Sequence, residues 1–312
     1  MVTRRSLLAA LPALCVATAG ARAAPDKTLR VGFQKGEPIL LAARENRTLE
    51  IALAPLGIDV QWLEFQFGPP MLEAMRIGSI DIGGVGDTPP VFAQAAHSDL
   101  VYIAAQHAGG QAILVPPGST LQTLQDLKGK RLAFGRGSSA HDLAVAALEK
   151  AGLGYDEIKP TYLAPADAAA AFERGAIDAW AVWDPYYALF EARPGVRVLA
   201  KWTDIEPQNS FFMARRAYVE ANPAIAVKIV AGFVEVSVWA RSHRPELAER
   251  LAKATGIPLD ALQRAVDRVP FEVVTMDAAV TAAQQKVADR FHRIGEIPEA
   301  IHVADAVWQP PA

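Results

Sequence analysis

The sequence contains one pattern of strand, loop and helix twice. Arg30–Gly36 matches Arg131–Gly137, because each has a basic residue, a short apolar run, Phe, and a loop with a cation and Gly. Likewise Ala74–Asp81 matches Ala171–Asp178, where a helix ends at Gly and Ile-Asp leads into a strand. The two matches keep their order about 100 residues apart, as a duplicated unit does. The chain is therefore predicted to fold as two related lobes.

Each unit alternates strands with helices. Short apolar runs such as Leu29–Gln34 and Arg131–Phe134 are typical of buried strands, and Pro38 stands where a helix running to about Leu49 can begin. The alternation predicts an α/β fold of two Rossmann-like lobes, with parallel sheets covered on both faces. The carboxyl ends of the strands should then lie at one edge of each sheet.

The last part of the chain is mostly helical in pattern. A helix from Pro223 to about Arg241 carries two apolar stripes, so we expect it to be largely buried on the first lobe. The chain should then cross between lobes near Gly109–Leu114 and near Asp204–Asn209, which makes a two-crossing hinge. The expected boundaries are residues 24–108 plus 208–312 for the first lobe and residues 109–207 for the second.

Residues 1–23 are interpreted as an export signal. Arg4 and Arg5 precede a short apolar run, and cleavage near Ala23 would deliver the protein to the periplasm. The Arg pair fits a twin-arginine signal as well as the Sec route, and a membrane anchor is the alternative. The only cysteine, Cys15, lies in this segment behind Leu14, so we expect neither lipidation nor a disulfide.

Net charge and sequence motifs limit the range of possible functions. Removing the signal lowers Lys+Arg from 31 to 28 against 34 Asp+Glu, so the net charge falls from −3 to −6. This balance argues against nucleic acid and anionic membranes as partners, since both need a basic face. The six His are scattered, and the sequence has no H-E-x-x-H, G-x-S-x-G or P-loop motif. We expect a monomer that is not an enzyme and that needs no cofactor or metal.

A loop of small and polar residues follows one predicted strand of the second unit. Ligands of open α/β sheets bind beyond the strand carboxyl ends. Here Gly137, Ser138, Ser139 and His141 precede a helix, whose free N–H groups and dipole attract an anion. Ser139 can instead be only an N-cap. Gly135–Ala140 also fits a dinucleotide fingerprint, although the acids that follow precede a strand rather than end one.

Four further loops complete the candidate site. Gln34 and Lys35 can bind an anion or form a solvated turn, and Trp183 can cover an alkyl chain or pack between the lobes. The carboxylates of Asp87 and Asp184 suit an amine better than an anion. Asp87 or Thr88 can also cap a helix. The other candidates are Gly86 and Asn209.

These loops together resemble the aliphatic sulfonate-binding proteins of ABC importers. The matching segments are Phe33–Gly36, Gly68–Ala74, Gly86–Ala95, Lys128–Gly129, Gly137–Ser139, Pro160–Ala168, Asp178–Tyr187 and Val307–Pro310. They cover nearly the whole chain after residue 23. The most specific is the run that ends in Trp183-Asp184-Pro185-Tyr186-Tyr187.

The resemblance implies a type II periplasmic-binding-protein fold, a membrane permease as partner and a role in sulfur acquisition. It places the contacts to a small anionic solute, an alkanesulfonate, on Gln34, Asp87, Thr88, Ser138, Ser139, His141, Trp183, Asp184 and Asn209. One stretch departs from the family, which tends to carry Pro and Lys where this chain has Gln106–Gln111. Taurine, nitrate, a phosphonate or a vitamin precursor are therefore alternative solutes. An enzyme on the same fold and a sensor are alternative functions.

Overall fold

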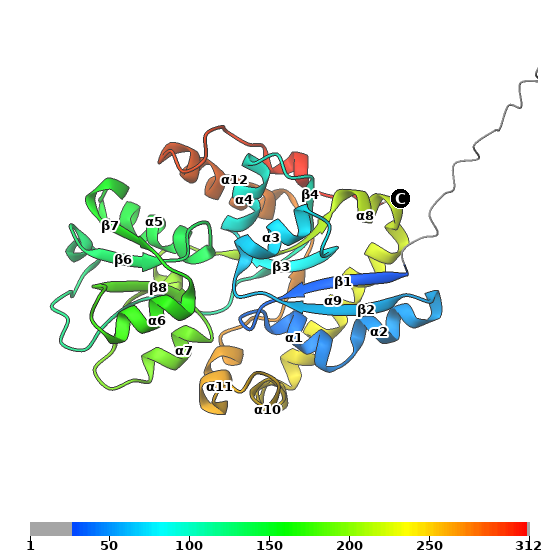
Figure 1. The fold of residues 1–312 in the computed structure, drawn as a ribbon, viewed down its shortest axis with the longest axis horizontal. Coiled ribbons are helices and arrows are strands. Elements are labelled where there is room, and N and C mark those ends of the chain that lie inside the picture. The colour runs from blue at the N-terminus through cyan, green and yellow to red at the C-terminus, as the bar shows by residue number, and fades with distance from the viewer. Residues whose placement is uncertain (1–26, 311–312) are drawn as a thin grey trace, which may run out of the picture.

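The computed structural model describes residues 27–310, so the predicted signal, Cys15 and the cleavage near Ala23 lie outside the described residues. The described chain forms two β-sheets, each with its own helices, and helices of the C-terminal tail lie where the two halves meet (Figure 1). The six-stranded sheet with its helices is called the first lobe, and the five-stranded sheet with its helices the second lobe.

The first lobe has the strand order β11-β4-β10-β3-β1-β2. Its strands are β1 (Thr28–Phe33), β2 (Asp59–Glu64), β3 (Ile82–Gly86), β4 (Leu100–His107), β10 (Asn209–Arg215) and β11 (Val273–Val274). Its helices are α1 (Pro38–Glu45), α2 (Thr48–Leu53), α3 (Gly68–Arg76), α4 (Thr88–Ala95), α8 (Arg216–Ala221) and α9 (Pro223–Ser242).

The second lobe has the strand order β7-β6-β8-β5-β9. Its strands are β5 (Gln111–Val115), β6 (Arg131–Phe134), β7 (Lys159–Tyr162), β8 (Ala179–Trp183) and β9 (Arg197–Lys201). Its helices are α5 (Ser139–Ala151), α6 (Pro165–Glu173) and α7 (Tyr186–Glu191). The tail adds α10 (Arg244–Thr255), α11 (Leu259–Asp267) and α12 (Ala278–Arg293), and short 3₁₀ turns lie at Ala54–Leu56, Leu124–Leu127, Tyr155–Glu157, Trp202–Asp204 and Val303–Ala306.

The predicted duplication is visible in atomic detail. The Asp81 carboxylate accepts the backbone N–H of Arg30 at 2.9 Å, and the Asp178 carboxylate accepts that of Arg131 at 2.7 Å. Each carboxylate also pairs with the guanidinium of the same arginine, at 3.5 Å and 2.8 Å. Equivalent residues thus tie the first strand of each unit to the chain that enters the next strand of the sheet.

The sheets are mixed, so the expectation of all-parallel strands was wrong. In the second lobe β5 runs antiparallel to β8 and β9, and in the first lobe β10 runs antiparallel to β3 and β4. Each is the first strand after the chain passes from one sheet to the other. A strand that arrives directly from the other lobe enters at the carboxyl edge of its neighbours. Its first residues therefore lie at the edge where the carboxyl ends of the other strands gather.

Two helix expectations need correction. The single helix expected to run from Pro38 to about Leu49 is broken, because Arg47 has a φ of 54° between α1 and α2. Helix α9 buries Ile229, Phe233 and Val236, but the stripe that contains Val227, Val234 and Val238 is exposed. By length and composition α9 can cross a membrane. A core helix of a soluble protein meets the same criterion, and this one packs against α1 and α2.

Candidate functional site

A cavity lies between the two lobes at the edges where their strands end. Its walls come from the loops after β1, β3, β4, β6 and β8, and from the first residues of β5 and β10. Residues far apart in sequence therefore face one space, as ligand sites of such sheets do. The tail adds an apolar wall made of Leu251, Leu262, Ala265, Val266 and Val269.

The lobes touch each other around this cavity. At Gly86 a Cβ atom would lie 2.6 Å from the Cβ of Ser139, and at Gly36 it would lie 2.6 Å from the carbonyl oxygen of Asp184. Real side chains do not approach so closely, so both positions need glycine for the lobes to meet. The structure is accordingly a closed arrangement of the two lobes.

The first turn of α5 opens into the cavity. Ser138 is its N-cap residue and makes no side-chain capping bond, so the alternative in which Ser139 caps the helix does not hold. The Ser138 hydroxyl donates to the carbonyl oxygen of Gly135 at 2.7 Å, and both Ser138 and Ser139 line the cavity. A helix start without a capping side chain presents N–H donors and the positive end of the dipole. This end of the cavity is suited to an anion.

The cavity is lined by part of the predicted set: Gln34, Lys35, Gly86, Ser138, Ser139, Trp183 and Asp184. Gln34 is positioned by its side-chain amide, which donates to the carbonyl oxygen of Gly84 at 2.8 Å. Lys35 is half-exposed, with its ammonium 3.7 Å from the Glu64 carboxylate. The remaining predicted residues, Asp87, Thr88, Gly137, His141 and Asn209, are not among the lining residues.

His141 and Gly137 form a hydrogen bond with each other. The N–H of Gly137 donates to Nδ1 of His141 at 3.2 Å, so Nε2 carries the proton and donates to the Tyr155 hydroxyl at 2.8 Å. The ring also stacks on Phe134 at 4.7 Å. Burial, together with the nearby Arg136, lowers the pKa of His141 to about 3, so the ring stays neutral. It supports the loop that leads into α5.

Asp87 and Thr88 lie in the chain between Gly86 and Pro89, which line the cavity. Asp87 is the N-cap residue of α4 without a side-chain capping bond, and Thr88 donates its hydroxyl to the Asp87 carboxyl at 2.9 Å. Burial and the neighbouring Asp142 raise the pKa of Asp87 well above its usual range. Gln284 of α12 donates to the Asp87 carbonyl oxygen at 2.6 Å. This contact links α12 of the tail to the start of α4.

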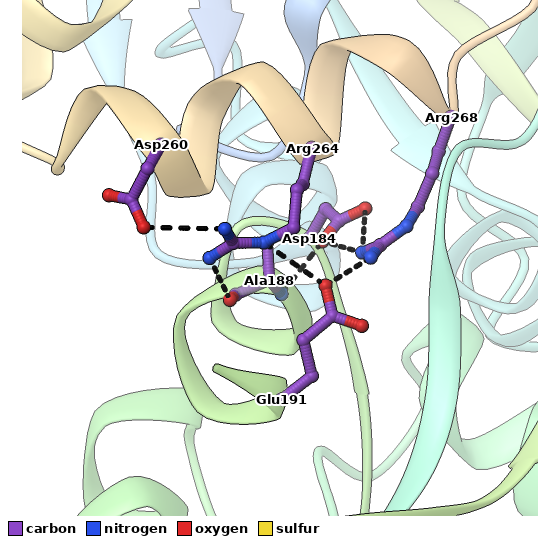
Figure 2. A network of polar contacts seen from close by, with 6 residues as sticks. All are labelled: Asp184, Ala188, Glu191, Asp260, Arg264 and Arg268. Carbon is purple, nitrogen blue, oxygen red and sulfur yellow. Dashed lines mark hydrogen bonds and ion pairs between the residues drawn. The ribbon is translucent and has the colours of Figure 1, made fainter. Parts of the chain in front are cut away.

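The Asp184 carboxylate is held by the protein itself. It accepts the N–H of Ala188 at 3.0 Å and the guanidinium of Arg268 at 3.0 Å. Figure 2 shows Arg264 of α11 and Arg268 just after it reaching toward the second lobe. They bind Asp184, which precedes α7, and Glu191 and the carbonyl oxygen of Ala188 in α7. Burial raises the pKa of Asp184 to about 6 although Arg268 opposes it. The network joins the tail to the second lobe beside the cavity.

Sequence reasoning missed several lining residues. Asn209 was predicted, but its side chain lies 3.1 Å from His107, and the adjacent Ser210 lines the cavity, since successive strand residues face opposite sides. Glu37, Gln106 and Gln111 also line it, and all three are buried. The only signal for the two glutamines was their place in the stretch that departs from the family pattern. Within residues 27–310, no group of His, Cys, Asp and Glu gathers as a metal site would.

The sequence also matches proteins of a known family. Residues 22–257 match the NMT1-like family. An aliphatic sulfonates-binding protein of Escherichia coli K12 is 42% identical over 306 residues, which is 97% of this chain and 95% of that protein.

Two solved structures share the fold. The periplasmic aliphatic sulphonate binding protein of Escherichia coli has a TM-score of 0.83 at 41% identity, covering 92% of this chain and 94% of that one. The alkanesulfonate-binding protein of Xanthomonas axonopodis bound to MOPS has a TM-score of 0.87 at 39% identity, covering 92% and 99%. These matches confirm the predicted periplasmic-binding-protein fold, and the relatives are binding proteins rather than enzymes. The chain belongs to the NMT1-like family and to the aliphatic sulfonate-binding proteins that these relatives represent.

Proposed function

We propose that this protein is the periplasmic solute-binding component of an ABC importer and that it binds alkanesulfonates for sulfur acquisition. The observation that carries the proposal is the uncapped first turn of α5, which opens into a cavity with an apolar wall. An anionic head group and an alkyl chain thus each have a matching surface. The Xanthomonas relative was solved with MOPS, which is itself a sulfonate.

In the proposed mechanism the sulfonate oxygens accept hydrogen bonds from the first turn of α5 and from the Ser139 hydroxyl. The chain lies against Trp183 and the wall of Leu262 and Val266. Closure excludes water, which strengthens these bonds. The ligand stabilises the closed state by the difference between its affinities for the closed and open states.

The lobes should move at the two connections between the sheets, where β4 ends at His107 and β10 begins at Asn209. The proposed lobes are residues 24–108 plus 208–312 and residues 109–207. The protein acts as a monomer that delivers its solute to a membrane permease. Export follows cleavage near Ala23 by the Sec or the twin-arginine route.

A ligand screen tests the proposal. Purified protein, unfolded and refolded to remove bound solute, is heated with alkanesulfonates, taurine, nitrate or phosphonates. A ligand that binds the folded state raises the melting temperature by mass action. We expect sulfonates to give the largest rise, confirmed by calorimetry. A larger rise with nitrate or a phosphonate, and none with any sulfonate, would reassign the solute.

A further inference from the structure

One part of the cavity carries hydrogen-bond acceptors that lack a donor. Gln106 and Gln111 line the cavity and are only 5% and 4% exposed. Their amide oxygens are shielded from solvent and have no hydrogen-bond partner within residues 27–310. Buried polar atoms of native proteins are nearly always paired, so such atoms at a binding cavity indicate that a ligand supplies the missing donor.

Glu37 lies at the same place. It is 5% exposed, lines the cavity, and packs over Gly84, where a Cβ atom would lie 3.0 Å from the Glu37 side chain. Its carboxylate accepts a hydrogen bond from the Gln106 amide, an uncharged partner rather than a cation. Burial raises the pKa of Glu37 to about 7. A cationic ligand group placed here would stabilise the ionised carboxylate.

The strand order sets the distance between this region and the anion-binding end. Gln106 in β4 and Gly86 in β3 both pair with Ser210 of β10, and Ser139 packs on Gly86. Two strand spacings separate the Gln106 and Gly86 backbones by about 10 Å. A sulfonate and an ammonium group joined by a few methylene groups, with one hydrogen bond at each end, fit such a span.

We infer that this site selects sulfonates that carry a hydrogen-bond donor, above all an ammonium group, a few carbon atoms from the sulfur. Glu37, Gln106 and Gln111 receive the donor while the first turn of α5 receives the sulfonate. This inference rests on the proposed function and narrows it.

A matched pair of solutes tests the inference. Butane-1-sulfonate and 3-aminopropane-1-sulfonate have the same length and differ only in a terminal methyl or ammonium group. Both are titrated by calorimetry at pH 8 into refolded protein. We expect the ammonium compound to bind at least about tenfold more tightly, as a charge-assisted hydrogen bond predicts.

Two variants test which residues cause the preference for the ammonium compound. In Glu37→Gln the ratio of the two affinities should fall to about threefold or less, because the carboxylate that faces the ammonium group is gone. In Gln111→Met, which keeps the side-chain length, the preference should also shrink. Circular dichroism shows whether each variant is folded.

The outcomes separate the inference from the proposed function. Equal or tighter binding of butane-1-sulfonate to the unchanged protein would overturn the inference and leave the proposed function standing. An undiminished ammonium preference in Glu37→Gln would also overturn it. If neither sulfonate binds, the proposed function itself fails.

Discussion

The Arg290 guanidinium of α12 lies 2.6 Å from the Asp142 carboxylate of α5, the helix whose first turn opens into the cavity. Both side chains are buried, and Arg290 also contacts Glu149 at 2.9 Å and Glu206 at 2.6 Å. These carboxylates raise the pKa of Arg290 although burial opposes it, so the side chain stays charged. The C-terminal tail thereby fixes the helix that forms the anion-binding end.

Replacing Arg290 with Met should destabilise the fold. The change leaves the fully buried Asp142 without its cation, and breaking a buried pair costs about 3–5 kcal/mol. Urea unfolding measures the loss. The matched control is Arg293→Met. Arg293 lies in α12 like Arg290 and also pairs with Glu149, but its side chain is 61% exposed. That change should cost less than about 1 kcal/mol. Equal losses in the two variants would contradict the role given to Arg290.

Gly86→Ala should weaken ligand binding by keeping the lobes apart. The new Cβ atom would meet the Cβ of Ser139 at 2.6 Å, a contact that only a shift of the lobes relieves. Calorimetry should show at least a tenfold loss of affinity, about 1.4 kcal/mol. Circular dichroism should show an unchanged fold.

A second substitution checks this explanation. Ser139→Gly removes the atoms that the new methyl group meets, so adding it to Gly86→Ala should recover part of the lost affinity. Ser139→Gly alone gives the baseline for the loss of the hydroxyl. A double variant that binds more weakly than both single variants would show that Gly86 acts in another way.

Arg268→Gln should speed ligand release. Arg268 joins α11 of the tail to Asp184 and Glu191 of the second lobe, so its loss favours the open state (Figure 2). We expect a several-fold faster dissociation in stopped-flow experiments that follow the fluorescence of Trp183 in the cavity wall. Arg193→Gln is the control, because its pair with Glu173 lies within the second lobe. Only Arg268→Gln should speed dissociation, because the Arg193–Glu173 ion pair does not cross between the lobes.

Much of the fold could be predicted because its signals are local. Apolar runs, prolines at helix starts and glycines at helix ends gave most strands and helices to within a few residues, and the duplication was readable from Asp81 and Asp178. The direction of the strand after each crossing could not be predicted, because it depends on the edge at which the chain enters a sheet. The short strand β5 was taken for a connection for the same reason.

The site was partly predictable. Loops after strands gave Ser138, Ser139 and Trp183, because the strand ends must face the other lobe. Side-chain direction could not be read in the same way. His141 turns to Tyr155, 14 residues further along the chain, and Asp184 turns to Arg268, 84 residues further along. Both contacts depend on how separate elements pack, which no local pattern shows. The apolar wall from Leu262 and Val266 was missed because the docking of the tail helices is a tertiary property.

Glu37 should make the stability of the protein depend on pH. Burial raises its pKa from 4.5 to about 7 in the folded state, so the folded protein holds this proton more tightly than the unfolded chain does. The stability that Glu37 gains from holding its proton is therefore fully present below pH 4.5 and is lost as the pH rises through about 7. Between pH 5 and pH 8 the loss amounts to about 2–3 kcal/mol.

The variant Glu37→Gln isolates this effect. Urea unfolding of both proteins at pH 5 and pH 8 gives a difference of differences in which other titrating groups, such as Asp184, cancel. The unchanged protein should lose about 2–3 kcal/mol more than the variant over this range. If the free energy of unfolding changed equally with pH in both proteins, Glu37 would not be a buried, uncompensated carboxyl. An ammonium-bearing sulfonate should reduce the difference, because it stabilises the ionised form, whereas butane-1-sulfonate should not.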